Sequence, residues 1–364
     1  VIRLLVVDDS ALVRKLLVRV FEAEADFEVE VARDGLEALE KLKTFGPDVI
    51  TLDVHMPTMD GLTCLDRIMI ERPCPVVMVS SLTAAGAEAT LEALRLGAVD
   101  FVAKPAGAVS LRLEEFAPEV VAKVRAAAGA RLPASLRLRD RVRHRIGAAP
   151  AARRARSTAV EPAAPGPPAS GEGRGLVVVG TSTGGPPALE ALLTPLPAGF
   201  PWPLVIAQHM PRTFTGPLAR RLDSICALSV VEVVEPMPLR PGTAYIGRGD
   251  ADVIVTRRAG ELVAMVAPGL PGYPWRPSAD RLVRTAMEQV AAERLVGVLM
   301  TGMGDDGAAA MALLHGRGGR TIAESEDTAV VWGMPGELVK AGGAEFVEPL
   351  PKIAERLMRL APCP

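Results

Sequence analysis

Residues 4–24 consist of the apolar run LLVVDD at 4–9 and the segment SALVRKLLVRVFEAE at 10–24. The apolar run ending in two acids predicts a buried strand, and the periodic segment predicts a helix. The same alternation continues, with further strands predicted at residues 29–32, 48–53, 75–80 and 100–105. Five short strands separated by helices predict a parallel sheet with helices on both faces.

The second half of the chain repeats this alternation. Strands are predicted at residues 176–180, 203–209, 229–235, 243–247, 252–258, 262–267, 296–303 and 321–325. Three of them, at 244–247, 252–257 and 261–266, follow one another so closely that they predict an antiparallel hairpin insert. The expected fold class is α/β: a five-stranded doubly wound domain, then a second doubly wound domain with a mainly parallel sheet and a small hairpin insert.

The length of 364 residues favours two domains, because one domain typically takes roughly 100–200 residues. Composition changes sharply between them. Residues 131–156 hold nine Arg and a single acid, and residues 157–175 are rich in Pro, Ala and Gly. We therefore expect domains at 1–125 and 175–364, joined by a linker at 126–174 that is a solvated tether rather than a docking segment.

Overall charge and composition exclude several classes of protein. The 41 Lys and Arg against 43 Asp and Glu give a net charge of −2, and aromatic residues make up only 4%, so a nucleic-acid partner is not expected. No apolar stretch approaches the ~18 residues of a membrane helix. The four cysteines form no Cys-x-x-Cys pair, and the first residues lack a signal-peptide pattern. These features predict a cytoplasmic protein that is not inserted in a membrane.

Polar residues follow the strands of the first domain. Asp8 and Asp9 end the first strand, Asp53 ends the third, Ser80 ends the fourth and Lys104 follows the fifth. Ligands of open α/β sheets bind at this carboxyl edge. Three converging carboxylates repel one another unless a hard cation such as Mg²⁺ neutralises them. The set predicts phosphoryl transfer to a carboxylate, with Mg²⁺ and the lysine countering the developing charge.

The first strand of the second domain ends in a glycine-rich turn. Residues 180–184, GTSTG, fit G-x-S-x-G between a strand and a helix, which is the context of a nucleophile elbow. Ser182 would be the nucleophile, and backbone N–H groups at the helix start would face a developing oxyanion. A phosphate-binding glycine loop is the alternative, although neither G-x-G-x-x-G nor G-x-x-x-x-G-K-[ST] is present.

A serine nucleophile needs a base and an orienting acid. Of the four histidines, His55 lies in the acidic pocket, His144 in the linker and His315 in a helical pattern. His209 ends a strand, as Ser182 does, and is the favoured base. Asp305 and Asp306 follow another strand, and spacing does not choose between them. The order Ser, His, Asp differs from that of α/β-hydrolases.

The first domain resembles the receiver domain of bacterial response regulators over residues 2 to about 125. The likeness is carried by VVDDS at 6–10, TLDVHMPTMDG at 51–61, MVSSLT at 78–83 and GAVDFVAKP at 97–105. It implies that Asp53 is the phosphoacceptor, that Asp8 and Asp9 hold Mg²⁺ with Asp53 and the His55 carbonyl, and that Ser80 and Lys104 contact the phosphoryl group. Phe101 is either the aromatic that changes rotamer on phosphorylation or plain core.

The second domain resembles the catalytic domain of the chemotaxis protein-glutamate methylesterase (CheB) family. The likeness is carried by GTSTGGP at 180–186, QHMPRTFTGPLARRLD at 208–223, PGTAYIG at 241–247, RPSAD at 276–280 and LMTGMGDDGAAAM at 299–311. It implies that Ser182 is the nucleophile, His209 the base and Asp306 the orienting acid. The amides of Thr183 and Met303 become candidates for oxyanion contacts.

Some residues depart from the family pattern. Residues 245–250 are YIGRGD where the family commonly has Tyr-Ile-Ala-Pro-Gly, His55 stands where a Glu is usual, and residues 276–286 match loosely. These changes spare the Ser-His-Asp set. They affect surfaces that face the substrate or take part in regulation.

Together the resemblances imply a phosphorylation-activated esterase. Its substrates would be glutamate methyl esters, and glutamine amides, on chemoreceptors; its phosphodonor would be a chemotaxis histidine kinase. The receiver would use Mg²⁺, and the ester chemistry would use no cofactor. The alternative is a phosphorylation-dependent signalling adaptor whose esterase-like domain binds a partner without turnover.

Overall fold

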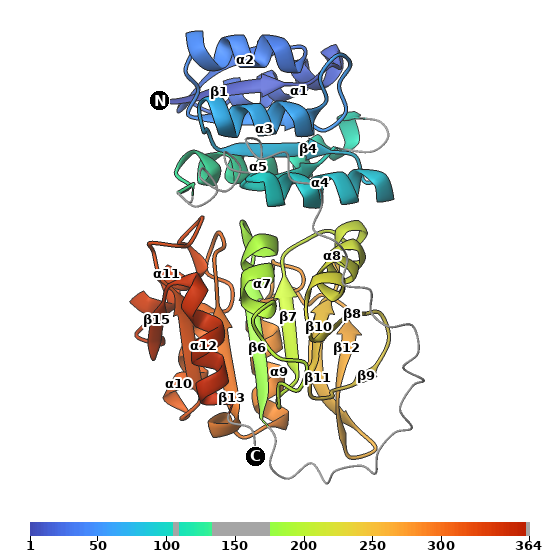
Figure 1. Ribbon diagram of the computed structural model, residues 1–364, viewed down its shortest axis with the longest axis vertical. Helices are drawn as coiled ribbons and strands as arrows, with labels where there is room; N and C mark the ends of the chain where they lie inside the picture. The colour runs from blue at the N-terminus through green and yellow to red at the C-terminus, as the bar shows by residue number, and fades with distance from the viewer. Residues whose placement is uncertain (105–108, 133–174, 362–364) are drawn as a thin grey trace, which may run out of the picture.

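The computed structural model describes residues 1–104, 109–132 and 175–361 and shows two α/β domains stacked end to end (Figure 1). The predicted linker, including His144, lies mostly outside the described residues. In the described part of the chain, no helix is long and apolar enough to cross a membrane.

The N-terminal domain has a five-stranded parallel sheet in the order β2-β1-β3-β4-β5, which confirms the predicted doubly wound fold. The strands are β1 (Ile2–Val7), β2 (Phe27–Ala32), β3 (Val49–Asp53), β4 (Val76–Ser80) and β5 (Asp100–Ala103). The helices are α1 (Ala11–Glu22), α2 (Gly35–Thr44), α3 (Gly61–Glu71), α4 (Ala84–Leu96) and α5 (Val109–Ala128).

Side-chain caps start the first four helices of this domain. Ser10, Asp34, Asp60 and Thr83 each accept a hydrogen bond from an amide in the first turn of α1, α2, α3 and α4, respectively. Such caps satisfy amides that have no partner within the helix. The caps therefore fix where each helix begins after its strand at the carboxyl edge of the sheet, the edge that carries Asp8 and Asp53.

The C-terminal domain has a seven-stranded parallel sheet in the order β15-β14-β13-β6-β7-β10-β8. Its strands are β6 (Leu176–Thr181), β7 (Leu204–Gln208), β8 (Ser229–Val233), β10 (Thr243–Gly247), β13 (Leu295–Leu299), β14 (Arg320–Glu324) and β15 (Phe346–Glu348). Its helices are α7 (Gly185–Leu193), α8 (Arg212–Ile225), α9 (Ala279–Gln289), the short 3₁₀ helix η1 (Ala292–Arg294), α10 (Ala308–Gly316), α11 (Met334–Lys340) and α12 (Leu350–Leu360).

The predicted hairpin insert is present, but one of its strands was assigned wrongly. β11 (Asp252–Arg258) and β12 (Glu261–Ala267) pair antiparallel, and β9 (Met237–Pro238) adds to β12. Residues 243–247 instead form β10, which is buried between β7 and β8 in the parallel sheet. Sequence proximity suggested the hairpin, whereas burial on both sides decides the pairing. β9 and β15 are too short to show a period.

The domains meet through α4, which packs against α7 and α8 (Figure 1). The Phe101 ring at the start of β5 lies 4.3 Å, centroid to centroid, from the Phe214 ring of α8. Arg131 after α5 donates to Glu326 Oε1 at 2.8 Å. The carboxyl edge of the C-terminal sheet therefore faces the N-terminal domain.

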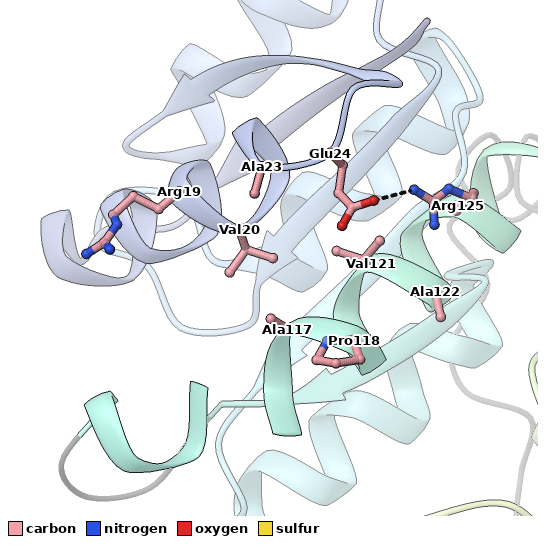
Figure 2. A pocket seen from close by; sticks show the side chains of 9 residues that line it. All are labelled: Arg19, Val20, Ala23, Glu24, Ala117, Pro118, Val121, Ala122 and Arg125. Atoms are coloured by element: carbon pink, nitrogen blue, oxygen red, sulfur yellow. Dashed lines mark hydrogen bonds and ion pairs between the residues drawn. The ribbon is translucent and has the colours of Figure 1, made fainter. Parts of the chain in front are cut away.

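A separate surface groove of about 510 Å³ lies between α1 and α5 (Figure 2). Its lining includes Val20, Val121 and Pro118, and Arg125 pairs with Glu24 at its rim at 3.0 Å. None of the residues that line it belongs to a predicted site.

Candidate active site

Ser182 occupies the predicted turn between β6 and α7. Its N–H donates to Thr301 O at 3.0 Å, and its carbonyl accepts from Gly185 N at 2.8 Å. Gly184 has a φ of 76°, in the left-handed region that glycine tolerates best. The turn therefore ends a buried strand and places the serine at the start of a helix.

Two close approaches explain why glycines surround this serine. A Cβ at Gly302 would lie 2.8 Å from Ser182 Cβ, and one at Gly185 would lie 1.9 Å from Gln208 Oε1. Gln208 Nε2 donates at 3.0 Å to the carbonyls of both Ser182 and His209. This amide ties the serine turn to the end of β7.

His209 follows β7, and its N–H donates to Thr181 O at 3.0 Å, which keeps it beside the end of β6. On its side chain, Nε2 lies 2.8 Å from Asp306 Oδ2, while Nδ1 is buried without a hydrogen-bond partner in the described part of the chain. With Nε2 donating to the carboxylate, Nδ1 carries the lone pair. The ring is therefore arranged as a base with one nitrogen oriented and the other free.

The Asp306 carboxylate sits at the start of α9. Oδ1 accepts from Ser278 Oγ at 2.9 Å and from Asp280 N at 3.0 Å, and Oδ2 also accepts from Ala279 N at 2.6 Å. Burial by itself raises the pKa of Asp306, but the His209 hydrogen bond and charge, together with two backbone amides, outweigh it and hold the pKa below its usual value. Asp306 is thus a stable anion that orients the imidazole.

Geometry makes the choice that spacing left open, because Asp306 contacts His209 whereas neighbouring Asp305 is exposed. Among the described residues, no hydrogen bond joins Ser182 Oγ to His209. The backbone N–H groups of Thr183 and Met303 likewise have no acceptor in the described part of the chain. Within the residues that the structure describes, the serine loop and the loop that leads to Asp306 therefore each contain one amide donor without an acceptor, and His209 holds a ring nitrogen without a partner.

The N-terminal domain brings its predicted acidic residues together. Asp8, Asp9 and Asp53 each place a carboxylate oxygen so that these atoms lie within 4.8 Å of one another. Lys104 Nζ lies 2.9 Å from Asp8 Oδ2 and 2.7 Å from Asp53 Oδ2. Asp8 is 0% exposed, and Oδ2 is buried with no hydrogen bond from the described residues beyond this ion pair.

The charges of this pocket are only partly compensated. Burial raises the pKa of Asp8, and the Asp53 charge adds to the rise, although Lys104 and the Ser10 amide oppose it. Burial opposes the charge on Lys104, but its contacts with Asp53 and Asp8 prevail and raise its pKa. Three carboxylates against one ammonium, which both Asp8 and Asp53 share, fit a hard divalent cation.

Other predicted residues lie near this pocket. His55 N donates to Asp53 Oδ1 at 3.3 Å. The Ser80 hydroxyl is buried and donates to Gly86 O at 3.3 Å, so its contact with a phosphoryl group stays a prediction. Phe101 is buried and packs against Phe214 of the other domain, a contact that neither sequence interpretation anticipated.

Several residues of the site were missed by sequence reasoning. Ser278 and the amide of Asp280 hold Asp306, and the indole of Trp275 stacks on His209. Thr183, next to Ser182, was expected to contribute only its amide, but its hydroxyl donates to Asp100 of the N-terminal domain. The quoted RPSAD motif at 276–280 was the only available signal, and it carried no role for these groups.

Comparison with known proteins follows the same division into two domains. The CheB methylesterase family matches residues 177–357, and the response regulator receiver domain family matches residues 4–114. Protein-glutamate methylesterase/protein-glutamine glutaminase 2 of Rhodopseudomonas palustris (strain BisB18) is 58% identical over 356 residues, 97% of this chain and 96% of that protein. The chain belongs to the CheB family. A Rhodospirillum rubrum protein of the same description, number 3, is 54% identical over 98% of this chain and 95% of its own length.

A solved structure supports the assignment of the second domain. The crystal structure of the Thermotoga maritima CheB methylesterase catalytic domain has a TM-score of 0.50 and 37% identity. It covers 51% of this chain and 98% of that one. Both predicted domain families are therefore confirmed for this CheB family member.

One of the departures from the family pattern, residues 245–250, lies next to His209. β10 ends at Gly247, and β10 pairs with β7, whose next residue is His209. A Cβ at Gly249 would lie 2.2 Å from Met210 O, and Asp250 has a φ of 62°. The altered segment therefore packs directly against Met210, the residue that follows His209.

Proposed function

We propose that this chain hydrolyses glutamate methyl esters, and glutamine side-chain amides, on methyl-accepting chemoreceptors, and that phosphorylation of Asp53 activates it. Its relatives carry the description protein-glutamate methylesterase/protein-glutamine glutaminase over nearly the full length. The observation that carries the proposal is the 2.8 Å contact between His209 and a buried, anchored Asp306 beside the Ser182 turn.

The chemistry follows the roles of a serine hydrolase. Ser182 Oγ attacks the ester carbonyl carbon and gives its proton to His209 Nδ1, while Nε2 stays hydrogen-bonded to Asp306. The free amides of Thr183 and Met303 are the donors for the oxyanion. His209 then protonates the leaving methanol, or ammonia from an amide, and water activated by the same nitrogen releases glutamate.

The N-terminal pocket accepts the phosphoryl group. Asp53 is the phosphoacceptor, with the chemotaxis histidine kinase as donor, and Ser80 and Lys104 contact the transferred group. Asp8, Asp9, Asp53 and the His55 carbonyl would hold Mg²⁺, which supplies positive charge against the phosphoryl oxygens when bound. Lys104 already bridges Asp8 and Asp53, so it neutralises part of the same charge.

The contact between the domains supports regulation of the hydrolase by the receiver. Asp100 at the start of β5 accepts the Thr183 hydroxyl, next to the nucleophile and on a residue whose amide is an oxyanion donor. Asp100 is itself held by Lys123 Nζ at 3.5 Å and by Phe101 N at 2.7 Å. Phosphorylation would shift the population away from this docked arrangement and free the serine loop.

Ser182→Ala tests the catalytic assignment. We expect methanol release from methylated receptor membranes to vanish, because the other two hydroxyls of the turn, those of Thr181 and Thr183, donate to Thr301 O and to Asp100. Thr181→Ser is a poor control because Thr181 Oγ1 supports Thr301 O; Ser224→Ala, on the exposed end of α8, is the suitable one. Retained methanol release in Ser182→Ala would overturn the triad.

Asp53→Asn tests the gate. We expect basal methanol release to persist and the response to a small phosphodonor to disappear, because the acceptor carboxylate is gone. Asp66→Asn, on α3, is the matched carboxylate control and should respond normally. Activation of the Asp53→Asn variant by the phosphodonor would refute the gate.

A signalling adaptor without turnover predicts a different chemical result. A serine-reactive phosphonate probe labels only an activated nucleophile, so stoichiometric labelling at Ser182 that is lost in His209→Gln supports the hydrolase. A folded protein whose Ser182 stays unlabelled would favour the adaptor.

A further inference from the structure

An indole lies over one face of the His209 imidazole. The two ring centroids are 5.2 Å apart, and the ring planes differ by 4°. Because stacked carbon atoms touch at about 3.5–4.0 Å, this separation indicates an offset parallel stack. The indole belongs to half-buried Trp275, which lies between β12 and α9.

The hydrogen bond to Asp306 does not by itself fix the imidazole. The chain holds Cγ of His209, and Asp306 holds Nε2 at 2.8 Å, so the ring can still turn about the line from Cγ to Nε2. Nδ1 lies off that line, so such a turn would change the direction of its lone pair. A flat group stacked on one ring face blocks this rotation.

The segment that carries Trp275 also carries the groups that hold Asp306. Three residues further along, Ser278 Oγ donates to Asp306 Oδ1 at 2.9 Å, and Ala279 N donates to Oδ2 at 2.6 Å. On the other side, a Cβ at Gly304 would lie 3.2 Å from Trp275 Cζ2, so the loop that leads to Asp306 supports the indole. The plane of the imidazole and its acid are thus set by one packed unit.

We propose that Trp275 is a positioning residue that fixes the plane of the His209 imidazole, keeps Nδ1 directed at Ser182, and stabilises the positive charge that the ring gains with the serine proton. A cation over an aromatic face is attracted by the ring quadrupole, and tryptophan provides the strongest face. This inference rests on the proposed role of His209 as the base.

Trp275→Phe and Trp275→Leu in the full chain separate stacking from bulk. We expect Trp275→Leu to lower kcat for methanol release about 10- to 30-fold, the order expected from losing a partly desolvated cation–π contact. KM should change less than about twofold, and Trp275→Phe should restore most of kcat, because phenylalanine also stacks. Trp202→Phe, whose ring lies against Gly175 at the start of β6, is the matched control and should keep wild-type kcat.

Other kinetic results would overturn the proposal. Unchanged kcat in Trp275→Leu would show that the ring plane needs no indole. A rise in KM at constant kcat would make Trp275 a substrate contact instead. Equal losses in the Phe and Leu variants would exclude stacking as the cause.

Tryptophan emission gives a second readout that a merely structural role would not produce. An imidazole ring stacked on an indole quenches its emission, so His209→Gln should raise the tryptophan emission at constant pH. The rise should be absent when His209→Gln is combined with Trp275→Phe, and its persistence in that background would overturn the proposal. Inactive His209→Gln with fully active Trp275→Leu would overturn this inference alone, whereas active His209→Gln would overturn the proposed function.

Discussion

Asp8 in the N-terminal domain and Asp306 in the C-terminal domain are 0% and 5% exposed, yet their pKa values move in opposite directions. Both lie after a strand of a parallel sheet. Asp306 accepts hydrogen bonds from a hydroxyl, two amides and an imidazole. Asp8 accepts one amide, from Ser10, and shares Lys104 with Asp53.

The two acids differ in how many hydrogen-bond donors surround them. Asp306 has several donors within the protein, whereas Asp8 has few and fits a bound cation. Preorganised donors cost nothing to rearrange when charge develops on His209, which suits catalysis. A cluster of carboxylates that accepts few hydrogen bonds within the protein binds a cation more strongly than a fully hydrogen-bonded one. Its charge balance can therefore change, which suits a switch. One chain therefore uses the carboxyl edges of its two parallel sheets for different purposes, by varying how many hydrogen bonds their acids accept.

The largest effect is expected when the negative charge of Asp306 is removed. Asp306→Asn should lower kcat about 10³- to 10⁴-fold, because an amide cannot stabilise the imidazolium and favours the wrong tautomer of His209. Asp305→Asn, one residue away and exposed, is the matched control and should stay within about twofold. Methanol release measures both, and a mild effect of Asp306→Asn would mean that the well-satisfied carboxylate is structural only.

The buried carboxyl group of Glu324 extends the comparison of Asp8 with Asp306. Glu324 is 0% exposed and accepts from Thr301 N at 2.8 Å and from Thr328 Oγ1 at 3.0 Å. Burial raises its pKa from 4.5 to about 7. Because the pKa of Glu324 is higher in the folded than in the unfolded state, its protonated form contributes to the free energy of unfolding. This contribution is complete below about pH 4.5 and is lost as the pH rises through 7.

Glu324→Gln should therefore flatten the pH dependence of stability. The free energy of unfolding of the wild type should fall by up to about 3 kcal/mol relative to the variant between pH 4.5 and 8, because the amide stays neutral. Glu326→Gln, on an exposed residue, serves as the control in urea unfolding at several pH values. Parallel curves for wild type and Glu324→Gln would contradict the raised pKa.

Metal addition tests the acidic pocket of Asp8, Asp9 and Asp53. Mg²⁺ at about 100 times its dissociation constant should stabilise the native state by about 2.7 kcal/mol. Asp8→Asn should lose most of this gain, and it should unfold at a higher temperature than the wild type without metal, because the buried repulsion with Asp53 is gone. Thermal unfolding with MgCl₂, against NaCl of equal ionic strength, measures the effect. Equal gains in wild type and Asp8→Asn would contradict the assignment of the metal ligands.

The sequence predicted the elements that depend on local pattern. Buried runs such as residues 176–181 and 204–208 predicted strands, and strand ends predicted that Ser182, His209 and an acid would meet. β10 is buried because β7 and β8 lie on either side of it. Its own residues do not indicate which strands are its neighbours, so its parallel pairing could not be predicted.

Contacts between distant segments were also beyond reach of the sequence. Thr183 and Asp100 are 83 positions apart, and each residue type fits many surface roles. Trp275 lies in a segment without a repeating pattern, so only folding shows that its ring covers His209. Residue types indicate which chemistry is available, whereas packing determines which groups position the reactive side chains.

The smallest expected effect lies in the contact between the two domains at Thr183 and Asp100. Asp100→Ala removes the acceptor for the Thr183 hydroxyl and should raise basal methanol release about 5- to 10-fold, the equivalent of one net hydrogen bond of about 1–1.4 kcal/mol. The stimulation by a phosphodonor should shrink by the same factor, because both changes favour the undocked state.

Arg131→Ala separates this specific link from general loosening of the domain contact. Arg131 pairs with Glu326 across the domains at 2.8 Å and is exposed, so it bridges the domains without touching the serine loop. Its loss should change basal turnover by less than about twofold, since exposed ion pairs contribute little. Equal activation by Arg131→Ala and Asp100→Ala would mean that the receiver acts by covering the site alone. Activation by Asp100→Ala only would mean that the receiver also acts through Thr183, on the amide donor beside the nucleophile.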